Sequence, residues 1–294
     1  MTALKIHNPF NAPVYHIETV TSTMDISKQL AQEGQPHGTV ICADFQEAGR
    51  GRGRARQWHM EKMTSLPFTI LLRCGTFDNI PPVLTLRAGL AVSLAIEDFL
   101  FFLENAGRKI PPVKVQVKWP NDVMINSKKA GGILSEANGA DVRIGIGVNI
   151  AQKEFPPLLS EKAVSIALAA DIDISADERF ILLEKILLRL YDELETAPQK
   201  QLTQRVQLTQ RAQLTQRADG DTMIIPGEPD WKPRLEQRLY KKGEQVVFLD
   251  GAAGSQKEIK GCLAGISDTG ELLIIPDGET KPRSFITGEI SASR

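Results

Sequence analysis

The sequence predicts an α+β fold, in which helices cover a mixed, mostly antiparallel sheet and a small β-barrel follows at the C-terminus. Short apolar segments bounded by turn residues indicate strands, and longer segments with apolar residues at helical spacing indicate helices. After residue 235 the pattern changes to short strands alone. With 294 residues the chain exceeds the usual length of one domain. We therefore expect a large domain over residues 1–235 and a small domain over 236–294.

The N-terminal elements follow from capping residues and apolar spacing. Ser22 or Thr23 can cap a short helix over 24–33, which Gly34 ends. Leucines and phenylalanines at helical spacing predict a long core helix over 84–105. Strands are expected at 39–45, 66–73, 113–117 and 123–125.

The second half begins with a hairpin signal. Asn138-Gly139 lies between apolar segments 132–137 and 142–148, an arrangement typical of a tight β-turn. A wide apolar face predicts a helix over 178–195. The hexapeptide repeat at 201–218 is low in complexity, and we expect it to be an expansion between elements without a chemical role. Strands of the small domain are expected at 245–249, 259–266, 272–275 and 284–287.

Composition excludes several classes of protein. No uninterrupted apolar run is long enough to span a bilayer, and the N-terminus lacks the basic and apolar regions of a secretory signal. The three cysteines and four histidines show no spacing typical of a metal site, a disulfide framework or a catalytic triad. We expect a soluble cytoplasmic protein with reduced thiols.

The strongest functional signal lies at residues 118–149, which read KWPNDVMINSKKAGGILSEANGADVRIGIGVNI. Lys118 and Lys129 bring positive charge, Asn121 and Asp122 bring polar groups, and paired glycines let a ligand approach bare backbone. Taken singly, Asp122 is better explained as a turn residue and Lys129 as a solvated hairpin tip. The ordered set indicates a nucleotide-handling site.

A second signal is the loop GRGRGRARQW at residues 49–58. Glycines make such a loop mobile, and guanidinium groups suit phosphate oxygens. The loop alone fits an RGG-like nucleic-acid segment equally well. However, the formal net charge of −1 supplies no global positive field, and few aromatic residues are available to stack on bases. A small anionic ligand is therefore favoured.

Together, the arginine loop, KWPND, the lysine in SKKAGG and the IGIGVN segment resemble the catalytic domain of biotin protein ligases. The resemblance implies a class II synthetase-like catalytic domain, an SH3-like C-terminal domain and the substrates biotin and ATP with Mg²⁺. It implies activation of biotin as biotinyl-5'-AMP and transfer to a lysine of a biotin carboxyl carrier protein domain. Only 20 residues precede Thr21, so we expect the monofunctional type, which lacks a DNA-binding domain.

The resemblance also implies roles for individual residues. Biotin-binding positions are Ser22, Thr23, Gln46, Gly49, Arg50, Lys129, Gly131 and Gly132. Nucleotide-binding positions are Arg50, Arg52, Trp58, Lys118, Asn121 and Asn149. Catalytic positions are Arg52, Lys118, Asp122 and Lys129, with Asp122 also the candidate ligand of Mg²⁺.

Two positions depart from the family pattern. Met24 stands where asparagine is common after the Ser-Thr pair, and Ala55 stands where glycine is common before the tryptophan. Two alternatives to a biotin ligase remain at this point: a lipoate or octanoate ligase with the same acyl-adenylate logic, and a nucleic-acid-binding protein that uses the arginine loop. We expect no DNA or membrane partner, whereas a homodimer is possible because an exposed sheet can pair subunits.

Overall fold

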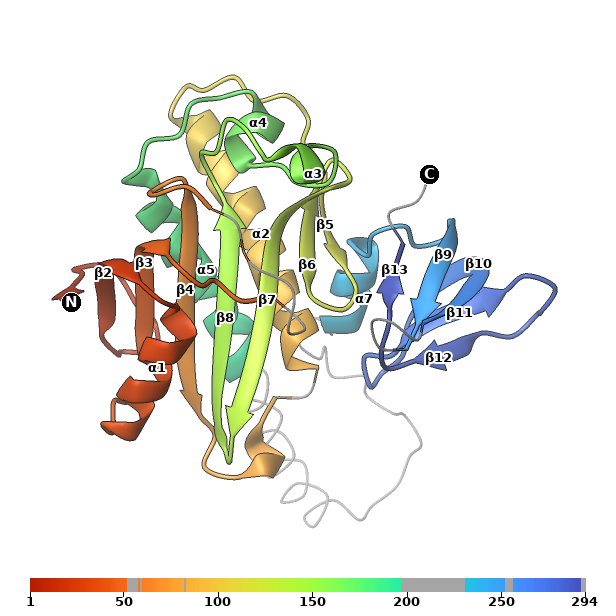
Figure 1. Ribbon diagram of the computed structural model, residues 1–294, viewed down its shortest axis with the longest axis horizontal. Coiled ribbons are helices and arrows are strands. Elements are labelled where there is room, and N and C mark those ends of the chain that lie inside the picture. Colours follow the sequence, from red (N-terminus) through yellow and green to blue (C-terminus); the bar gives the residue numbers. More distant parts are fainter. Residues whose placement is uncertain (52–57, 59, 82, 197–230, 252–255, 292–294) are drawn as a thin grey trace, which may run out of the picture.

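The computed structural model describes residues 1–51, 58, 60–81, 83–196, 231–251 and 256–291. A large eight-stranded sheet and a separate five-stranded sheet dominate it (Figure 1). In the large sheet the strand order is β1-β2-β3-β4-β8-β7-β6-β5, and β2 with β3 is the parallel pair. The strands are β1 Thr2–Ala3, β2 Val14–Val20, β3 Val40–Gln46, β4 Ser65–Arg73, β5 Val115–Lys118, β6 Asp122–Ile125, β7 Lys128–Asn138 and β8 Asp141–Asn149.

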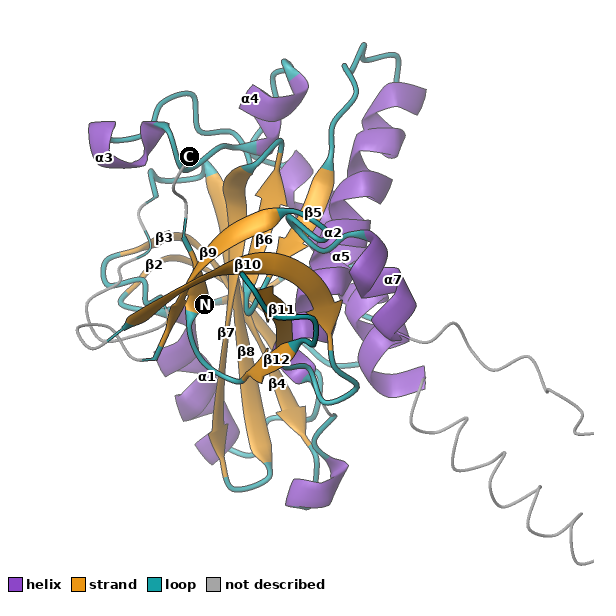
Figure 2. Ribbon diagram, turned by 90° about the vertical axis from the view of Figure 1, so that its right-hand side faces the viewer, coloured by secondary structure: helices purple, strands orange, loops and turns teal. Residues whose placement is uncertain are grey.

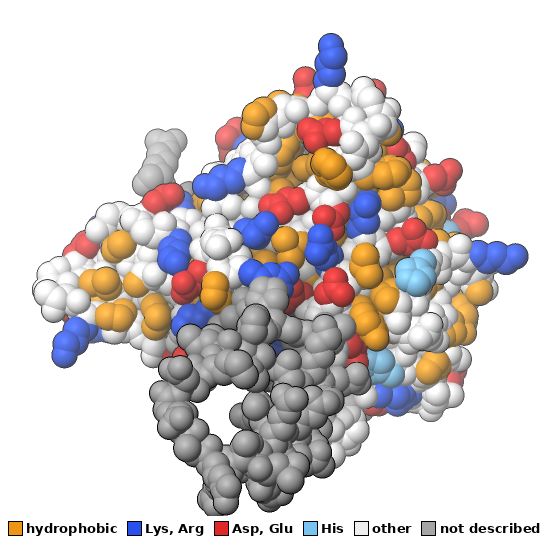
Figure 3. Space-filling view, turned by 180° about the vertical axis from the view of Figure 1, so that it is seen from behind, with side chains coloured by type: hydrophobic (Ala, Val, Ile, Leu, Met, Phe, Trp, Pro, Cys, Tyr) orange, Lys and Arg blue, Asp and Glu red, His pale blue; other side chains and the backbone are white. Residues whose placement is uncertain are grey.

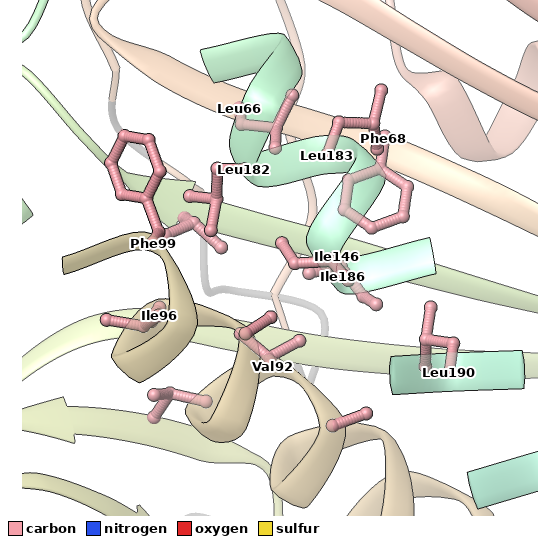
Figure 4. Close-up of a cluster of buried hydrophobic side chains, with 14 of the residues drawn as sticks. Leu66, Phe68, Val92, Ile96, Phe99, Ile146, Leu182, Leu183, Ile186 and Leu190 are labelled. Atoms are coloured by element: carbon pink, nitrogen blue, oxygen red, sulfur yellow. The ribbon is translucent and has the colours of Figure 1, made fainter. Parts of the chain in front are cut away.

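Two long helices cover one face of the large sheet. These are α2 (Leu84–Asn105) and α5 (Glu178–Tyr191), and α1 (Thr23–Gln32) lies on the opposite face (Figure 2). Apolar side chains from both helices meet those of the central strands in one cluster (Figure 4). Its fully buried members include Phe68, Val92, Ile96, Phe99, Leu182, Leu183, Ile186 and Leu190.

The small sheet is antiparallel throughout, with strand order β12-β11-β10-β9-β13. A second apolar cluster joins it to α2 and to β5 of the large sheet. In this cluster Leu86 and Leu90 of α2 and Val117 of β5 pack with Phe248, Leu263 and other side chains of the small sheet. The strands are β9 Gln245–Asp250, β10 Lys257–Ile266, β11 Leu272–Pro276, β12 Arg283–Phe285 and β13 Glu289–Ile290.

The predicted α+β class and most predicted elements are confirmed. The hairpin at Asn138-Gly139 forms as expected, with Gly139 at φ 61° and Asn138 opposite Asp141. The helix expected over 178–195 changes to a π-helical turn, η2 (Asp192–Thr196), after Tyr191. The predicted domain boundary after residue 235 falls inside α7 (Trp231–Gln237), and the repeat at 201–218 lies outside the described residues. The short elements that the sequence did not predict are β1, β2, β13, η1 Phe77–Asn79, α3 Pro157–Ser160, α4 Ile166–Ala170 and α7.

The face that carries α2 and α5 has acidic and basic side chains interspersed with apolar ones (Figure 3). Some of these charges pair across the helices: Arg189 of α5 bonds Asp98 of α2 at 2.7 and 2.8 Å. Within the described part of the chain, none of the helices combines the length and the apolar character that crossing a bilayer requires.

A buried ion pair connects α5 to the large sheet and gives a prediction about stability. Arg179 contacts Asp44 of β3, and both side chains are almost fully buried, with His16 also 2.6 Å from Asp44. Replacing Arg179 with methionine should lower the free energy of unfolding by about 3 kcal/mol, because Asp44 keeps its buried charge and loses its main partner. Urea denaturation measures this loss.

The matched control is Arg189→Met, which removes an ion pair whose two side chains are each about one-third exposed. Solvent screens that pair, so its loss should cost less than about 1 kcal/mol. Equal destabilisation by the two variants would contradict the expectation.

Candidate active site

A cleft lies between the N-terminal end of α1 and the exposed face of the large sheet. It lies on the side of the sheet opposite α2 and α5. Strands β3, β7 and β8 form its walls, together with residues of the arginine loop. The lining residues are Ser22, Thr23, Met24, Gln46, Arg50, Gly51, Trp58, Phe68, Asn121, Lys129, Gly132, Ile133, Leu134, Gly145, Ile146 and Gly147.

One end of the cleft is polar. Gln46, the last residue of β3, accepts two hydrogen bonds at its Oε1: from the backbone N–H of Thr23 at 2.8 Å and from its hydroxyl at 3.0 Å. Thr69 of β4 in turn donates to the hydroxyl of Thr23 at 2.9 Å. These bonds fix the orientation of the Gln46 amide. Ser22 caps α1 by accepting from Met24 N at 3.3 Å, as the sequence predicted.

Bare backbone forms the floor of the cleft. Gly145 and Gly147 lie two residues apart on β8, so they face the same side of the sheet, and Gly132 of β7 lies opposite Gly147. Each β8 glycine is covered by a side chain. A Cβ at Gly147 would lie 2.8 Å from the indole of Trp58, and one at Gly145 would lie 2.8 Å from Met24 Sδ. The glycines therefore make room for these two side chains.

Trp58 itself is held by a hydrogen bond from its backbone N–H to the Gly49 carbonyl, at 2.9 Å. Its Nε1 is buried and has no hydrogen-bond partner among the described residues. A buried N–H without a partner is costly, so this donor is available to a ligand in the cleft. The structure thus gives a packing role to the Trp58 ring and leaves its polar atom for recognition.

The fit of Trp58 onto Gly147 gives a prediction. In Gly147→Ala the new methyl group should displace the indole, because the nearest ring atom would be closer than any ordinary carbon contact. We expect Trp58 to become accessible to acrylamide, which quenches tryptophan fluorescence. Comparison with Trp58→Phe gives the part of the increased quenching that belongs to Trp58. Quenching identical to that of the unchanged protein would contradict the displacement. Combining Gly147→Ala with Trp58→Ala should remove most of the stability loss caused by Gly147→Ala alone.

The other end of the cleft is charged. Lys129 of β7 extends along the floor to place its Nζ 2.5 Å from Oδ1 of Asp122 on β6. Asn121 holds the intervening turn against β7, because its side chain donates to the Ile133 carbonyl at 2.8 Å and its own carbonyl accepts from Ile133 N–H at 2.9 Å. The KWPND turn thus delivers Asp122 to the lysine.

Lys118 lies beside this pair and does not line the cleft. It ends β5, directly opposite Asp122 of β6, and only 8% of it is exposed. Burial lowers the pKa of Lys118, while the negative charges of Asp122 and Glu289 oppose that change. Its ammonium group forms no ion pair within the described ranges. A buried cation next to the cleft is suited to an anionic ligand.

Arg50 and Asn149 are two further predicted site residues. Arg50 lies at the rim, where its Nη2 is 2.8 Å from Asp25 Oδ1 and 3.9 Å from Glu136 Oε1. Asn149, which is 4% exposed, donates to the Val164 carbonyl at 3.2 Å, and its Oδ1 has no partner in the described part of the chain. Arg50 lines the cleft, whereas Asn149 is not among the residues that line it.

Gly131 is turned away from the cleft, since a Cβ there would meet the Gly147 carbonyl and Val123. Its assignment to biotin binding stays a prediction without support from this placement. Arg52 and Ala55 lie outside the described residues. Sequence reasoning missed the apolar lining and Thr69; the alternating glycines of IGIG could have indicated a bare sheet face, whereas nothing distinguishes Thr69 from any other strand residue.

Residues 16–149 match the model of the biotin/lipoate A/B protein ligase family. They contain the cleft and every described residue placed in it, so the similarity to that family includes the candidate site.

Individual proteins of known name are similar to this chain as well. The bifunctional ligase/repressor BirA of Bacillus subtilis is 37% identical over 164 residues, which are 53% of this chain and 46% of that protein. The biotin–[acetyl-CoA-carboxylase] ligase of Mycobacterium tuberculosis is 31% identical over 60% of both chains. The chain thus spans about half the length of the curated relatives it matches. A biotin protein ligase from Aquifex aeolicus, solved with biotin and ATP, superposes with a TM-score of 0.68 at 26% identity, covering 95% of this chain and 97% of the other.

Proposed function

We propose that the protein is an ATP-dependent biotin protein ligase. It activates biotin as biotinyl-5'-AMP and transfers the biotinyl group to a lysine of a biotin carboxyl carrier protein domain. The observation that carries this proposal is the division of the cleft, which has hydrogen-bonding groups at one end and the Lys129–Asp122 pair at the other. The family match and the Aquifex aeolicus ligase support it.

The polar end fits the ureido ring of biotin. Thr23 bonds the Oε1 of Gln46 and so orients its amide with the Nε2 hydrogens as donors, and the Ser22 hydroxyl, which accepts from Met24 N, keeps its own donor. Apolar side chains that lie over the glycines of β8, among them Met24 and the Trp58 ring, suit the aliphatic chain. The ligand's carboxylate then lies near Lys129, the cation that reaches over Gly132.

In the first step, a carboxylate oxygen of biotin attacks the α-phosphorus of ATP and pyrophosphate leaves. Two anionic groups must approach each other, so nearby cations stabilise the transition state. Lys129 lies at the point of reaction, with Lys118 behind it and Arg50 at the rim. Asn121, Asn149 and Trp58 border the end where the nucleotide would lie.

Mg²⁺ is expected with ATP. The described residues contain no group of three or more potential metal ligands, but Mg²⁺ on nucleotides is commonly held by one or two carboxylates and the phosphates themselves. Asp122 fits that requirement, because Lys129 engages one of its oxygens and the other remains. When bound, the ion would neutralise phosphate charge.

In the second step, the neutral amine of the carrier lysine attacks the carbonyl carbon of biotinyl-5'-AMP, and AMP leaves. We propose that Asp122 orients this amine and accepts its proton. The proposal extends to the two domains expected at 1–235 and 236–294.

The test is ATP–pyrophosphate exchange in the presence of Mg²⁺, comparing biotin, lipoate and octanoate. Exchange that depends on biotin alone supports the proposal. Exchange with lipoate or octanoate instead would identify the second candidate, a ligase for those acids, which the same family includes. The polar contacts at Gln46 favour biotin, since octanoate has nothing at that end to bond with them. Salt-sensitive binding of oligonucleotides without any pyrophosphate exchange would instead support the nucleic-acid-binding protein that uses the arginine loop.

Arg52 gives a prediction about adenylate retention. Its resemblance to the loop arginines of the family and the affinity of guanidinium for phosphate suggest that it helps to keep biotinyl-5'-AMP in the cleft. Arg52→Gly should therefore release the reactive adenylate and increase biotinylation of bystander lysines by about tenfold, the effect of losing roughly one charge-assisted hydrogen bond. A streptavidin blot of mixed proteins measures this, and leakage no greater than that of the unchanged enzyme would count against it.

A further inference from the structure

Trp119 belongs to the KWPND turn, yet its side chain points away from the cleft. It is 3% exposed and packs in the apolar cluster shared with the small sheet. Its Nε1 donates to the carbonyl of Gly270, at 3.0 Å, in the turn between β10 and β11. Its ring also lies 6.1 Å from that of Phe248 on β9. The turn that carries Asn121 and Asp122 is therefore attached to the small sheet.

The position of Gly270 is itself fixed. Its φ is +84°, a backbone conformation that favours glycine, and a Cβ there would lie 1.9 Å from Cγ1 of Val83 at the start of α2. The β10–β11 turn is thus seated closely against α2. The Gly270 carbonyl, which accepts from Trp119, therefore cannot move without breaking the contact between Gly270 and Val83.

Backbone hydrogen bonds to the C-terminal part of the chain hold β5, the strand before Trp119. Val117 donates to the Arg238 carbonyl at 2.8 Å and accepts from Tyr240 N–H at 2.9 Å. Residues 238–240, which connect α7 to β9, thereby extend the large sheet beyond β5. Lys118 lies between these two attachments, the backbone pairing of Val117 and the side-chain anchor of Trp119.

Charged groups from every neighbouring element act on Lys118. Asp122 of β6 and Glu289 of β13 favour its cation, whereas Lys129 of β7 and Lys241 before β9 disfavour it. Two of these four groups belong to the C-terminal part of the chain. The C-terminal part of the chain therefore contributes to the electrostatic field around Lys118.

We propose that Trp119 is a positioning residue through which the small C-terminal sheet holds Lys118 in its buried place beside the Lys129–Asp122 pair. The consequence for catalysis rests on the proposed ligase function: by this contact the small sheet takes part in the activation of biotin, although none of its described residues lines the cleft. The contact itself is a property of the fold and is testable without activity.

The variant is Trp119→Phe, which keeps an aromatic ring and removes the N–H that bonds to Gly270. The matched control is Trp231→Phe, since Trp231 packs against the same cluster from α7. The first measurement is the extent of lysine acetylation by acetic anhydride at one fixed pH, read by peptide mass spectrometry. Lys260, whose side chain is 65% exposed, serves as the internal reference.

Acetylation requires the reagent to reach the amine, so its extent reports the exposure of each lysine. In the unchanged protein Lys118, which is 8% exposed, should be acetylated far less than Lys260. In Trp119→Phe the reagent should reach Lys118, and its acetylation should rise toward that of Lys260. Trp231→Phe should leave the acetylation of Lys118 unchanged. Identical acetylation of Lys118 in Trp119→Phe and the unchanged protein would overturn the proposal.

The second measurement is pyrophosphate exchange. Trp119→Phe should raise the KM for ATP by about tenfold, equivalent to a loss of about 1.4 kcal/mol, and leave transfer from preformed biotinyl-5'-AMP within about twofold. Equal losses in both steps that follow a fall in Tm would reduce Trp119 to a folding role and overturn the proposal. If the unchanged protein shows no biotin-dependent exchange, the ligase function fails, and the extent of acetylation still decides whether Trp119 positions Lys118.

Discussion

Replacing Lys129 with glutamine should reduce biotin-dependent pyrophosphate exchange by about a thousandfold, the upper range for removing one group that stabilises developing charge. The side chain is placed by β7, passes over Gly132 and ends 2.5 Å from Asp122. Its ammonium is the cation of the cleft nearest the carboxylate–phosphate junction in the proposed reaction. Glutamine keeps most of the length and hydrogen bonding and removes the charge, so the loss should appear mainly in kcat.

The adjacent lysine provides a matched control. Lys128 is also on β7, but its Nζ donates to the Ser160 carbonyl at 3.0 Å, and it does not line the cleft. Lys128→Gln should keep exchange within about twofold, as expected for a partly exposed surface contact. Circular dichroism confirms that both variants fold. Similar losses for the two variants would mean that net positive charge near the sheet matters, and that Lys129 has no specific role.

Local elements of this fold follow from the sequence because short-range physical rules determine them. Asn138-Gly139 supplies the positive φ that a tight hairpin needs, and Ser22 supplies the acceptor that begins α1. The apolar spacing at 84–105 gives α2 with the bounds expected. In each case the signal lies within a few residues of the structure it determines.

Long-range pairing is not encoded in this local way. β4 pairs with β8 along its whole length, from Ser65 opposite Asn149 to Arg73 opposite Asp141, although more than sixty residues of chain separate the two strands. The apolar pattern of each strand fits several neighbours equally well. The contact between Thr69 and Thr23 depends on that pairing, so it could not be expected before the sheet was known.

The candidate site shows the same division. The motif lysines, Asn121 and Asp122 were indicated by type and order, and the structure brings Asp122 and Lys129 together. The direction of Trp119 was not indicated, because a tryptophan in a turn suits a ligand cleft and an interface between sheets equally well. Its partner, the Gly270 carbonyl, lies 151 residues away in the sequence.

The second large effect is expected for Asp122→Asn in the transfer step. The incoming lysine has an ordinary pKa of about 10.4, so at neutral pH nearly all of it is protonated and unreactive. Asp122 is the carboxylate of the KWPND turn and bonds Lys129 within the cleft, which places an acceptor for that proton beside the reacting carbonyl. Asparagine has the same shape and accepts no proton. Transfer from preformed biotinyl-5'-AMP should therefore fall by about a hundredfold, the lower range for loss of a general base.

The pH dependence of transfer separates this role from a loss of binding. Without the carboxylate, the rate should depend on the supply of neutral amine and rise by about tenfold per pH unit below the pKa of the lysine, whereas the unchanged enzyme should depend on pH less steeply. Asp141→Asn is the control, because Asp141 pairs with Arg73 at the far end of the β7–β8 hairpin. If Asp122→Asn transfers biotin from the preformed adenylate as fast as the unchanged enzyme, Asp122 does not accept the proton, and its bond to Lys129 serves only to place the lysine.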